Sequence, residues 1–304
     1  MDNKPHKAGF VNIIGKPNVG KSTLMNKLVN EKIAIITSKA QTTRHRIMGI
    51  LNGEDFQIVY SDTPGIIKPK YELHKSMMRF VNRSFDDADI ILFVTDIYES
   101  PLQIQQEDKK LTAKLEQLKV PLFLLLNKVD LAKEDDVLEK IGLWKDFVNA
   151  REIIPISALH GFNTDKVFEL ILENLPSHPP FYPKDEITDK PERFFASEII
   201  REKIFLNYKK EVPYSSEVVI TDFKEKKDII YIRAEIFVER KSQKGILIGK
   251  EGTALKKVGM AARKDLELFF GKKVFLEQFV KVEPNWRSKT GKLSKFGYYP
   301  NNEH

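Results

Sequence analysis

The stretch that decides the fold of this 304-residue chain is Gly15-Lys16-Pro17-Asn18-Val19-Gly20-Lys21-Ser22, which fits the pattern G-x-x-x-x-G-K-[ST]. A strand-like run, Phe10-Val11-Asn12-Ile13-Ile14, precedes it, and a helical pattern follows it directly. Glycines in such a turn let backbone N–H groups close around phosphates at a helix N-terminus, where the helix dipole favours anions. The pattern therefore predicts a phosphate-binding loop in which Lys21 reaches the β- and γ-phosphates and Ser22 ligates Mg²⁺.

The sequence around this loop, up to residue 175, alternates short β-rich apolar runs with helical patterns. This alternation is typical of an α/β domain with a mostly parallel sheet. The pair Asn52-Gly53 between two alternating runs is a hairpin signal, so one strand should run antiparallel to the others. We expect strands near 8–14, 46–52, 55–61, 89–95, 121–127 and 152–156, and helices near 21–30, 71–85, 103–119, 134–149 and 164–175.

A carboxylate follows the third expected strand, in Asp62-Thr63-Pro64-Gly65. At the carboxyl end of a strand, Asp62 can hold Mg²⁺ through water, and the N–H of Gly65 can contact a γ-phosphate. Taken alone, these four residues are equally typical of a plain turn.

A second such segment, Asn127-Lys128-Val129-Asp130, follows the apolar run that ends at Leu126. A carboxylate there can accept hydrogen bonds from guanine N1–H and the 2-amino group, which adenine does not offer as a pair. The segment therefore predicts selection of guanine over adenine nucleotides. Ser157-Ala158, after another apolar run, is a weaker candidate that would supply a backbone N–H to guanine O6.

The second part of the chain has a different pattern and a different charge. Four prolines fall within residues 175–183, a density that helices and central strands do not tolerate. We expect a first domain over 1–175, a linker over 176–190, a second domain over 191–284 and a basic, irregular tail over 285–304. Lys and Arg balance Asp and Glu in residues 1–180 (24 of each), whereas residues 181–304 carry 26 against 19. This asymmetry indicates a polyanionic partner, nucleic acid or an anionic membrane, for the second part.

The second domain has the expected order α-β-β-α-α-β, with a helix near 191–208, strands near 214–222 and 228–239, a helix-rich stretch over 243–270 and a strand near 273–282. Between its last two helices lies Gly249-Lys250-Glu251-Gly252, inside a segment (240–295) with 15 basic and 5 acidic residues. This arrangement resembles a KH domain, whose GxxG loop clamps about four nucleotides. The resemblance implies RNA contacts by Lys244, Ile246, Ile248, Gly249, Lys250, Glu251, Gly252, Lys256, Lys257 and Arg263, with the two isoleucines on the floor of the groove. Lys256-Lys257 and Lys272-Lys273, taken singly, are equally typical of a solvated surface.

Composition excludes several classes of protein. The chain has no cysteine, so disulfide frameworks, Cys-ligated zinc and iron–sulfur clusters are ruled out. Its apolar runs are far shorter than the roughly 20 residues of a membrane-spanning helix. The first ten residues lack the apolar core of a signal peptide. A soluble cytoplasmic protein is the expectation.

Both halves together resemble the Era family of bacterial ribosome-assembly GTPases, over nearly the whole chain. The resemblance implies a GTPase that binds the 3′ region of small-subunit ribosomal RNA and acts in assembly of the 30S subunit, with Mg²⁺ as cofactor, no DNA partner, and peripheral contact with the inner membrane. The motifs of the first domain also resemble those of translation-factor-type GTPases, which implies that Gln41-Thr42-Thr43-Arg44-His45 is the first switch, whose threonine ligates Mg²⁺ only when the γ-phosphate is present. We favour Thr43 over Thr42 for this role. The implied catalytic residues are Lys21, Thr43 and Gly65, and the implied metal ligands are Ser22, Thr43 and Asp62.

The residue after Gly65 is Ile66, where many small GTPases carry a glutamine that orients the attacking water. An aliphatic side chain cannot polarise water, so hydrolysis by this chain alone should be slow. A partner could supply the missing group, or a potassium ion could add charge beside the phosphates, with Asn18 as its candidate ligand. Asn18 is equally well explained as a turn residue. The expected GTP-binding residues are Gly15, Lys16, Pro17, Asn18, Val19, Gly20, Lys21, Ser22, Thr23, Asp62, Thr63, Pro64, Gly65, Ile66, Asn127, Lys128, Val129, Asp130, Ser157 and Ala158.

Two other functions fit the same motifs. One is a membrane-directed or protein-directed signalling GTPase whose basic C-terminal half is only an anchor. The other is a non-catalytic RNA-binding protein in which the nucleotide is a structural ligand.

Overall fold

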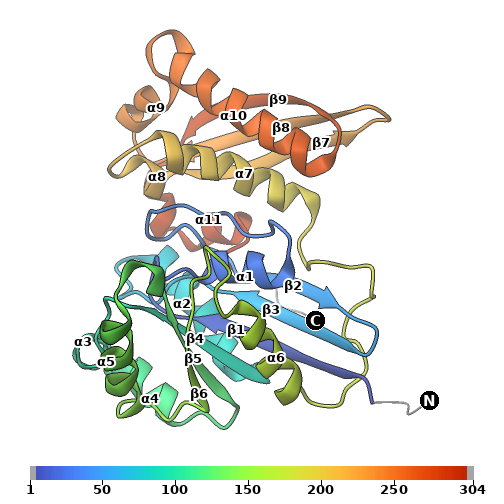
Figure 1. Ribbon diagram of the computed structural model, residues 1–304. Helices are drawn as coiled ribbons and strands as arrows, with labels where there is room; N and C mark the ends of the chain where they lie inside the picture. The colour runs from blue at the N-terminus through green and yellow to red at the C-terminus, as the bar shows by residue number, and fades with distance from the viewer. Residues whose placement is uncertain (1–4, 300–304) are drawn as a thin grey trace. The chain divides into compact units, whose positions relative to one another are not determined.

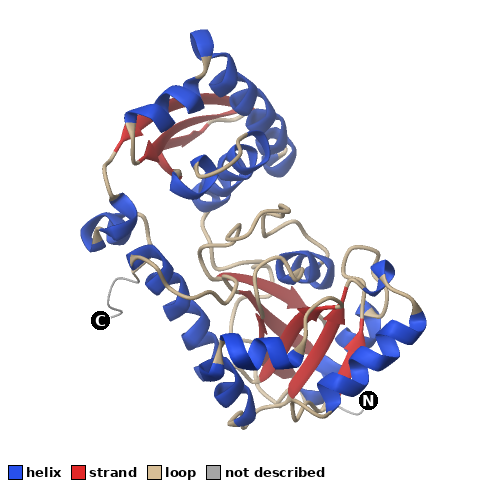
Figure 2. Ribbon diagram, turned by 90° about the vertical axis from the view of Figure 1, so that its left-hand side faces the viewer, coloured by secondary structure: helices blue, strands red, loops and turns tan. Residues whose placement is uncertain are grey.

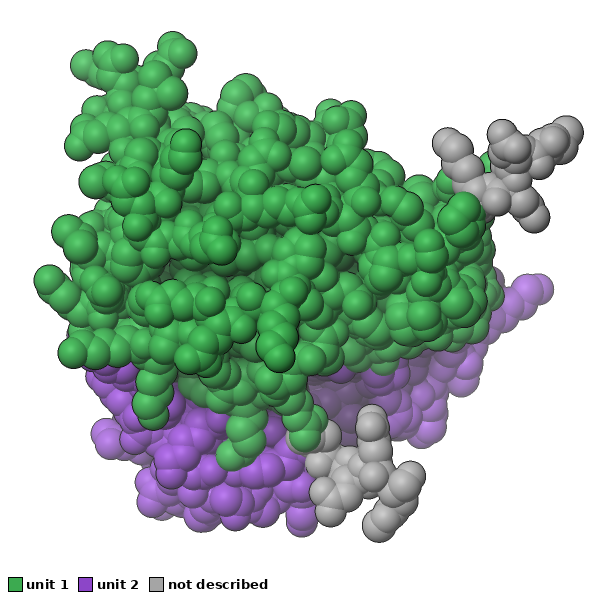
Figure 3. Space-filling view, turned by 90° about the horizontal axis from the view of Figure 1, so that it is seen from below, with its two compact units in different colours: residues 1–34, 43–67, 78–189 green, residues 35–42, 68–77, 190–304 purple. Residues whose placement is uncertain are grey.

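The computed structural model describes residues 5–299, which form two compact units (Figures 1, 2 and 3). The first unit takes in the chain up to Ala34 together with Thr43–Ile67 and Met78–Asp189. The second takes in Ile35–Thr42, Lys68–Met77 and the chain from Lys190 onward. Two short segments of the N-terminal half therefore belong with the C-terminal residues, which the sequence did not predict.

The first unit contains a six-stranded sheet in which only one strand is antiparallel (Figure 1). That strand is the edge strand β2, which pairs with β3 in the hairpin predicted from Asn52-Gly53. The expected mostly parallel α/β architecture is confirmed. In spatial order the strands are β2 (Ile47–Asn52), β3 (Phe56–Asp62), β1 (Lys7–Ile14), β4 (Ile90–Asp96), β5 (Leu122–Asn127) and β6 (Glu152–Pro155).

Helices cover both faces of this sheet. On one face α1 contacts β1, β2, β3 and α6. On the other, residues of α3, α4 and α5 share a buried cluster with β4 and β5, which is why those central strands are almost entirely apolar. The helices of this half of the chain are α1 (Lys21–Val29), α2 (Glu72–Asp86), α3 (Pro101–Glu107), α4 (Lys109–Glu116), α5 (Glu134–Lys145) and α6 (Thr164–Asn174), with a 3₁₀ turn η1 (Val129–Leu131).

The single helix expected over 103–119 is wrong: two helices, α3 and α4, occupy this stretch. The break falls at Asp108, whose carboxylate accepts a hydrogen bond from the N–H of Leu111 at 3.1 Å. An aspartate at such a position satisfies an N–H that the helix leaves unpaired, so it starts a new helix instead of continuing the old one.

The proline-rich stretch is packed against the first unit. Thr188 forms an antiparallel bridge with Gly49, and the N–H of Ile50 donates to the carbonyl of Ile187 at 2.9 Å. The side chain of Gln57 also accepts from the N–H groups of Phe181 and Tyr182 at 2.7 and 3.0 Å. The expected linker over 176–190 is therefore an ordered strap along the edge of the sheet up to Asp189.

The second unit has a three-stranded sheet in the order β7-β8-β9, with β7 and β8 antiparallel and β8 and β9 parallel (Figures 1 and 2). Apolar residues alternate along β8, and the buried set packs against α7, α9 and α10. The elements are α7 (Glu192–Asn207), α8 (Val212–Ser215), β7 (Glu217–Glu225), β8 (Ile229–Val238), α9 (Lys241–Ile248), η2 (Lys250–Gly252), α10 (Thr253–Phe270), β9 (Lys273–Val282), η3 (Trp286–Ser288) and α11 (Thr290–Lys295). The predicted order α-β-β-α-α-β is confirmed.

Two local predictions in this unit are wrong. The first strand begins at Glu217, not at 214, because Val212–Ser215 form a helical turn with proline in its first positions. The tail is not irregular, since η3 and α11 occupy part of it.

Two aromatic residues of the tail, Trp286 and Tyr298, are buried. The indole N–H of Trp286 donates to the carbonyl of Ser215 at 2.9 Å. These rings therefore pack the fold and are not exposed for stacking on bases.

None of the helices within residues 5–299 combines the length and the apolar character that crossing a bilayer requires.

Candidate functional site

The predicted phosphate-binding loop joins the end of β1 to the start of α1 in the first unit. Gly20, just before α1, has φ 102°, and a Cβ at this position would collide with the side-chain amide of Asn127. Only glycine satisfies both conditions. The loop therefore makes a tight turn directly before α1, and a helix N-terminus is where backbone N–H groups can bind a phosphate.

Lys21 lies over this loop. Its side chain is buried, and its ammonium group donates to the carbonyls of Gly15 at 3.1 Å and Lys16 at 2.7 Å. Burial lowers the pKa of Lys21 to about 8, although the carboxylates of Asp62 and Glu99 oppose the shift. A buried cation held in this position is suited to neutralise the charge of a phosphate.

Three oxygen-bearing side chains meet beside Lys21, as the motifs predicted. The hydroxyl of Ser22 donates to Asp62 Oδ2 at 2.5 Å and lies 2.9 Å from Thr43 Oγ1, and Thr43 Oγ1 donates to the same carboxylate oxygen at 3.2 Å. Burial raises the pKa of Asp62, while Lys21 and the two hydroxyls oppose this. Within the described residues Asp62 Oδ1 has no hydrogen-bond partner. Hydroxyl and carboxylate oxygens are the ligands that Mg²⁺ prefers, together with water and substrate phosphates, so this cluster fits the ion.

The geometry distinguishes the two adjacent threonines. Thr42 Oγ1 donates to the carbonyl of Lys39 at 2.7 Å and lies 2.6 Å from Thr37 Oγ1, so it is engaged within its own loop. Thr43 is the one whose hydroxyl reaches Ser22 and Asp62. This arrangement supports the assignment of Thr43.

Gly65 lies against the phosphate-binding loop. A Cβ on Gly65 would come within 2.6 Å of the backbone nitrogen of Pro17, and the N–H of the following residue, Ile66, donates to the carbonyl of Gly15 at 3.0 Å. The side chain of Ile66 packs against the apolar cluster of β4, β5 and their helices. Its aliphatic side chain contributes to packing and offers no group that could orient water.

The segment predicted to recognise guanine is tied to the phosphate-binding loop. Asn127 is 3% exposed; its amide donates to the carbonyl of Val19 at 2.7 Å, and its side-chain oxygen accepts from the N–H of Ala158 at 2.9 Å. Lys128, in the left-handed conformation (φ 64°), forms an ion pair with Asp96 at 2.9 Å.

Asp130 lies in η1, with its carboxylate 3.8 Å from His160 Nε2 and its side chain 26% exposed. The carboxylate is therefore accessible to a base. The N–H of Ser157 donates to Phe162 at 3.2 Å and that of Ala158 to Asn127, so a contact of either group with guanine O6 stays a prediction.

The GxxG loop of the second unit follows α9. Gly249 has φ 72° and Gly252 φ 78°, and a Cβ on Gly249 would come within 2.7 Å of the Cβ of Ala254. At Gly252, in contrast, no atom lies within 4 Å of where a Cβ would be, so another chain can approach the backbone there.

A groove of about 410 Å³ runs from this loop between α10 and β9. Of the residues predicted from the sequence, Gly252 lines it just before α10, and Lys256 and Arg263 line it on α10. Ile246 and Ile248 do not line it; Ile246 is 50% exposed on α9, and Ile248 packs against the core. Lys257 does not line it either. The floor and far wall come from Leu255, Met260, Val274, Phe275, Leu276 and Gln278, which the sequence analysis missed.

Part of this lining carried a readable signal. Lys256, Met260 and Arg263 are spaced by four and three residues and therefore share a helix face. Phe275 and Gln278 belong to a strand about twenty residues away, so no local pattern could have joined them to the helix.

Comparisons with known proteins match both units of the chain. A family model described as a 50S ribosome-binding GTPase matches residues 10–128, and one described as a KH domain matches residues 211–287. A crystal structure of an Aquifex aeolicus Era variant bound to GDP and AlF₄⁻ is 41% identical, covers 96% of this chain and 99% of its own, and superposes with a TM-score of 0.89. A structure of Era with MgGDPNP and nucleotides 1506–1542 of 16S ribosomal RNA has the same identity, coverage and TM-score. With this similarity over nearly the full length of both chains, and with both sites present, the chain belongs to the Era family of GTPases.

Proposed function

We propose that this chain is a GTP-driven switch that binds the 3′ region of small-subunit ribosomal RNA and acts in assembly of the 30S subunit. The observation that carries the proposal is the Era complex with MgGDPNP and nucleotides 1506–1542 of 16S ribosomal RNA, which is similar to this chain over 96% of its length. The motifs of both domains and the groove beside the GxxG loop support it.

In the nucleotide site, the N–H groups of the loop 15–22 and the ammonium of Lys21 would hold the phosphates, while Asp130 would accept hydrogen bonds from guanine. Ser22, Thr43 and Asp62 would hold Mg²⁺, which supplies positive charge to the phosphate oxygens during hydrolysis. The N–H of Gly65 would contact the γ-phosphate. Because Asp62 already accepts from both hydroxyls, the three side chains need little rearrangement to act together.

Intrinsic hydrolysis should be slow, because the side chain of Ile66 packs against apolar residues and offers no polar atom. Asn18, with φ 65°, remains the candidate ligand for a potassium ion. Single-turnover hydrolysis by the full-length protein should be faster in KCl than in NaCl at equal ionic strength if potassium acts there. Equal rates in the two salts would remove potassium from the mechanism and leave activation to a partner.

In the RNA site, the GxxG loop would approach the sugar–phosphate backbone of about four nucleotides, and the bases would lie on the apolar floor of the groove. Lys256 and Arg263 on α10 would contact phosphates. Lys244, Lys250 and Lys257 are further candidate phosphate contacts outside the groove lining. Single-stranded RNA is the expected ligand, since its bases can be turned outward, and duplex DNA is not.

The decisive experiment measures binding of the full-length protein, with a non-hydrolysable GTP analogue, to the 3′-terminal strand of 16S ribosomal RNA and to a scrambled strand over a range of salt. Phosphate contacts alone would bind both strands alike and weaken steeply with salt. A preference of about tenfold or more, equivalent to about 1.4 kcal/mol, shows readout of the bases. Equal binding would reduce the second unit to a basic anchor and contradict the ribosomal proposal.

The same protein should act in the cytoplasm, with any membrane contact peripheral. Binding to vesicles of anionic lipid at physiological salt checks this part. Vesicle binding stronger than binding to the 3′-terminal strand would favour the membrane-directed alternative.

A further inference from the structure

The loop between α1 and β2 contains seventeen residues without helix or strand, 30–46, and includes the threonines of the nucleotide site. Its central part, Ile35–Thr42, belongs to the second unit. Loops of this length inside a compact domain usually have a function of their own. What fixes its conformation therefore bears on the site that follows it.

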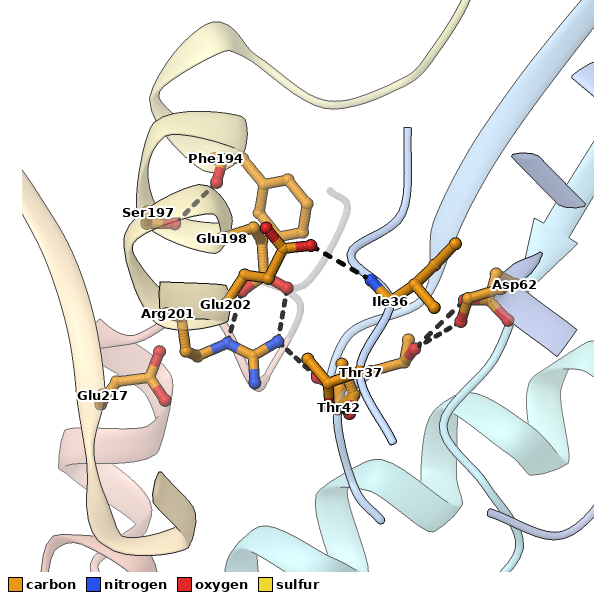
Figure 4. Close-up of polar contacts among 12 residues, drawn as sticks. Ile36, Thr37, Thr42, Asp62, Phe194, Ser197, Glu198, Arg201, Glu202 and Glu217 are labelled. Atoms are coloured by element: carbon orange, nitrogen blue, oxygen red, sulfur yellow. Dashed lines mark hydrogen bonds and ion pairs between the residues drawn. The ribbon is translucent and has the colours of Figure 1, made fainter. Parts of the chain in front are cut away.

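Within the second unit this segment forms hydrogen bonds with α7 and its C-terminal end at three places, and Figure 4 shows two of them, those of Ile36 and Thr42. The N–H of Ile36 donates to Glu202 at 3.5 Å, a long contact. The ammonium of Lys39 donates to the carbonyls of Phe205 and Tyr208. Carbonyls at a helix C-terminus have no partner in the helix and attract cations, so Lys39 satisfies the end of α7.

The third contact comes from Arg201, in the middle of α7. Its guanidinium Nη2 donates to the carbonyl of Thr42 at 2.5 Å, and Nε and Nη2 form a bidentate pair with Glu198 at 2.7 and 2.5 Å (Figure 4). The residue is 1% exposed. Burial alone would lower the pKa of Arg201, but the carboxylate of Glu198 outweighs it, so the pKa is raised and the charge is retained.

A buried ion pair of this kind contributes little to stability, because desolvation offsets most of the attraction. Such pairs are instead suited to holding one arrangement of the chain. Here Arg201 also donates to the carbonyl of Thr42, so the pair holds the loop as well. The planar guanidinium gives Glu198 two hydrogen bonds and the Thr42 carbonyl a third in one fixed arrangement, whereas the ammonium of a lysine has no such rigid fork.

Thr42 is joined by one peptide bond to Thr43, whose hydroxyl contacts Ser22 and Asp62 in the first unit. Fixing the carbonyl of Thr42 fixes the plane of that peptide bond, and with it the direction in which Thr43 leaves the loop. On the other side, α7 packs against α10, the helix that lines the RNA groove, and Lys203 links the two helices through an ion pair with Asp265.

We propose that Arg201 is a positioning residue for the GTP state: by holding the Thr42 carbonyl, it orients Thr43 toward Ser22 and Asp62. This inference rests on the proposed role of Thr43 and deepens it. It assigns a helix of the RNA-binding unit a direct part in setting the conformation of a nucleotide-site loop. Loss of Arg201 should weaken the binding of GTP more than the binding of GDP, because only the GTP-bound protein uses Thr43.

The test uses full-length Arg201→Lys, which keeps a positive charge beside Glu198, and a double variant, Arg201→Met with Glu198→Gln, which leaves no unpaired buried charge. Arg193→Met, an exposed position on the same helix, is the matched control. Amide hydrogen exchange of residues 36–43 is measured in nucleotide-free protein, and affinities for GDP and a GTP analogue are measured with Mg²⁺.

Both Arg201 variants should raise exchange over residues 36–43 by about tenfold, as expected for loss of a charge-assisted hydrogen bond, while α10 exchanges as in the wild type. The ratio of GTP-analogue to GDP affinity should fall about fivefold or more. RNA affinity without nucleotide should not change, and Arg193→Met should behave as wild type.

Wild-type exchange over residues 36–43 in both Arg201 variants would overturn the proposal. Increased exchange throughout α7 and α10 would also overturn it, and so would an equal loss of affinity for GDP and the GTP analogue. Either result would mean that Arg201 only stabilises the fold. A wild-type protein that does not distinguish GTP from GDP would contradict the proposed switch, and the exchange measurement, which uses no nucleotide, would still decide whether Arg201 holds the loop.

Discussion

The side-chain amide of Asn127 donates a hydrogen bond to the carbonyl of Val19 at 2.7 Å, joining the predicted guanine-recognition segment to the phosphate-binding loop. The same side chain accepts from the N–H of Ala158 at 2.9 Å. Three segments that lie far apart in the sequence are therefore held by one buried residue. The sequence analysis placed Asn127 in the site as a nucleotide contact; the structure shows that it also organises the site.

Asn127→Ala should weaken binding of GDP and of a GTP analogue to a similar extent. The substitution leaves the Val19 carbonyl and the Ala158 N–H buried without their partner, which costs about 1–3 kcal/mol, or roughly 5–150-fold in affinity. Titration calorimetry with each nucleotide measures the effect, with Asn82→Ala on the exposed side of α2 as the control. Unchanged affinities would show that the three segments are held by other contacts.

Asp130→Asn should change the base that the site prefers. The carboxylate accepts from two donors of guanine, whereas the amide offers one acceptor and turns an N–H₂ toward the second donor. We expect GTP affinity to fall by at least about thirtyfold, since losing one partner of a charged hydrogen-bonded pair costs about 2–5 kcal/mol. Xanthosine triphosphate, with a carbonyl in place of the 2-amino group, should bind the variant better than GTP does. Retained GTP preference would argue against base recognition by Asp130.

Lys256→Gln and Lys257→Gln form a matched pair in α10, because only Lys256 lines the groove. Lys256→Gln should weaken RNA binding and reduce the slope of log affinity against log salt by about 0.7, the value for one phosphate contact on a single strand. Lys257→Gln should have a smaller effect on both. Equal effects of the two substitutions on RNA affinity would mean that α10 attracts RNA only through its overall positive charge.

Gly249→Ala and Gly245→Ala test the GxxG loop in the same way. An alanine at 249 would be strained at φ 72° and would press on Ala254, while nothing lies within 4 Å of a Cβ at 245. We expect Gly249→Ala to lower RNA affinity about tenfold or more, because the loop must shift away from its RNA-binding conformation, and Gly245→Ala to leave it unchanged. Thermal unfolding of both variants separates a loop effect from general destabilisation. Wild-type RNA affinity in a folded Gly249→Ala protein would exclude the loop from the RNA site.

Much of the first unit could be predicted because its signals are local. The strands around Ile14, Asp62 and Asn127 end where the motifs begin, so the sequence already placed these motifs at the carboxyl ends of strands, where α/β folds bind ligands. The helix break at Asp108 was missed because an apolar periodicity continues through it. The signal was a capping aspartate, which is visible only once its hydrogen bond to Leu111 is known.

By itself, the sequence determined the order of motifs, the two fold classes, the preference for guanine and the position of the basic half, because each follows from residue spacing and composition over short stretches. Only the tertiary structure showed that the hydroxyl of Thr43, and not that of Thr42, contacts Ser22 and Asp62, because those two residues come from other elements. Likewise, it alone placed the segment Ile35–Thr42 beside α7, through Arg201 and a carbonyl 159 residues away in sequence. Local periodicity records which face of a helix or strand is buried, but the partner of a buried polar group is set by residues that the chain brings together only when it folds.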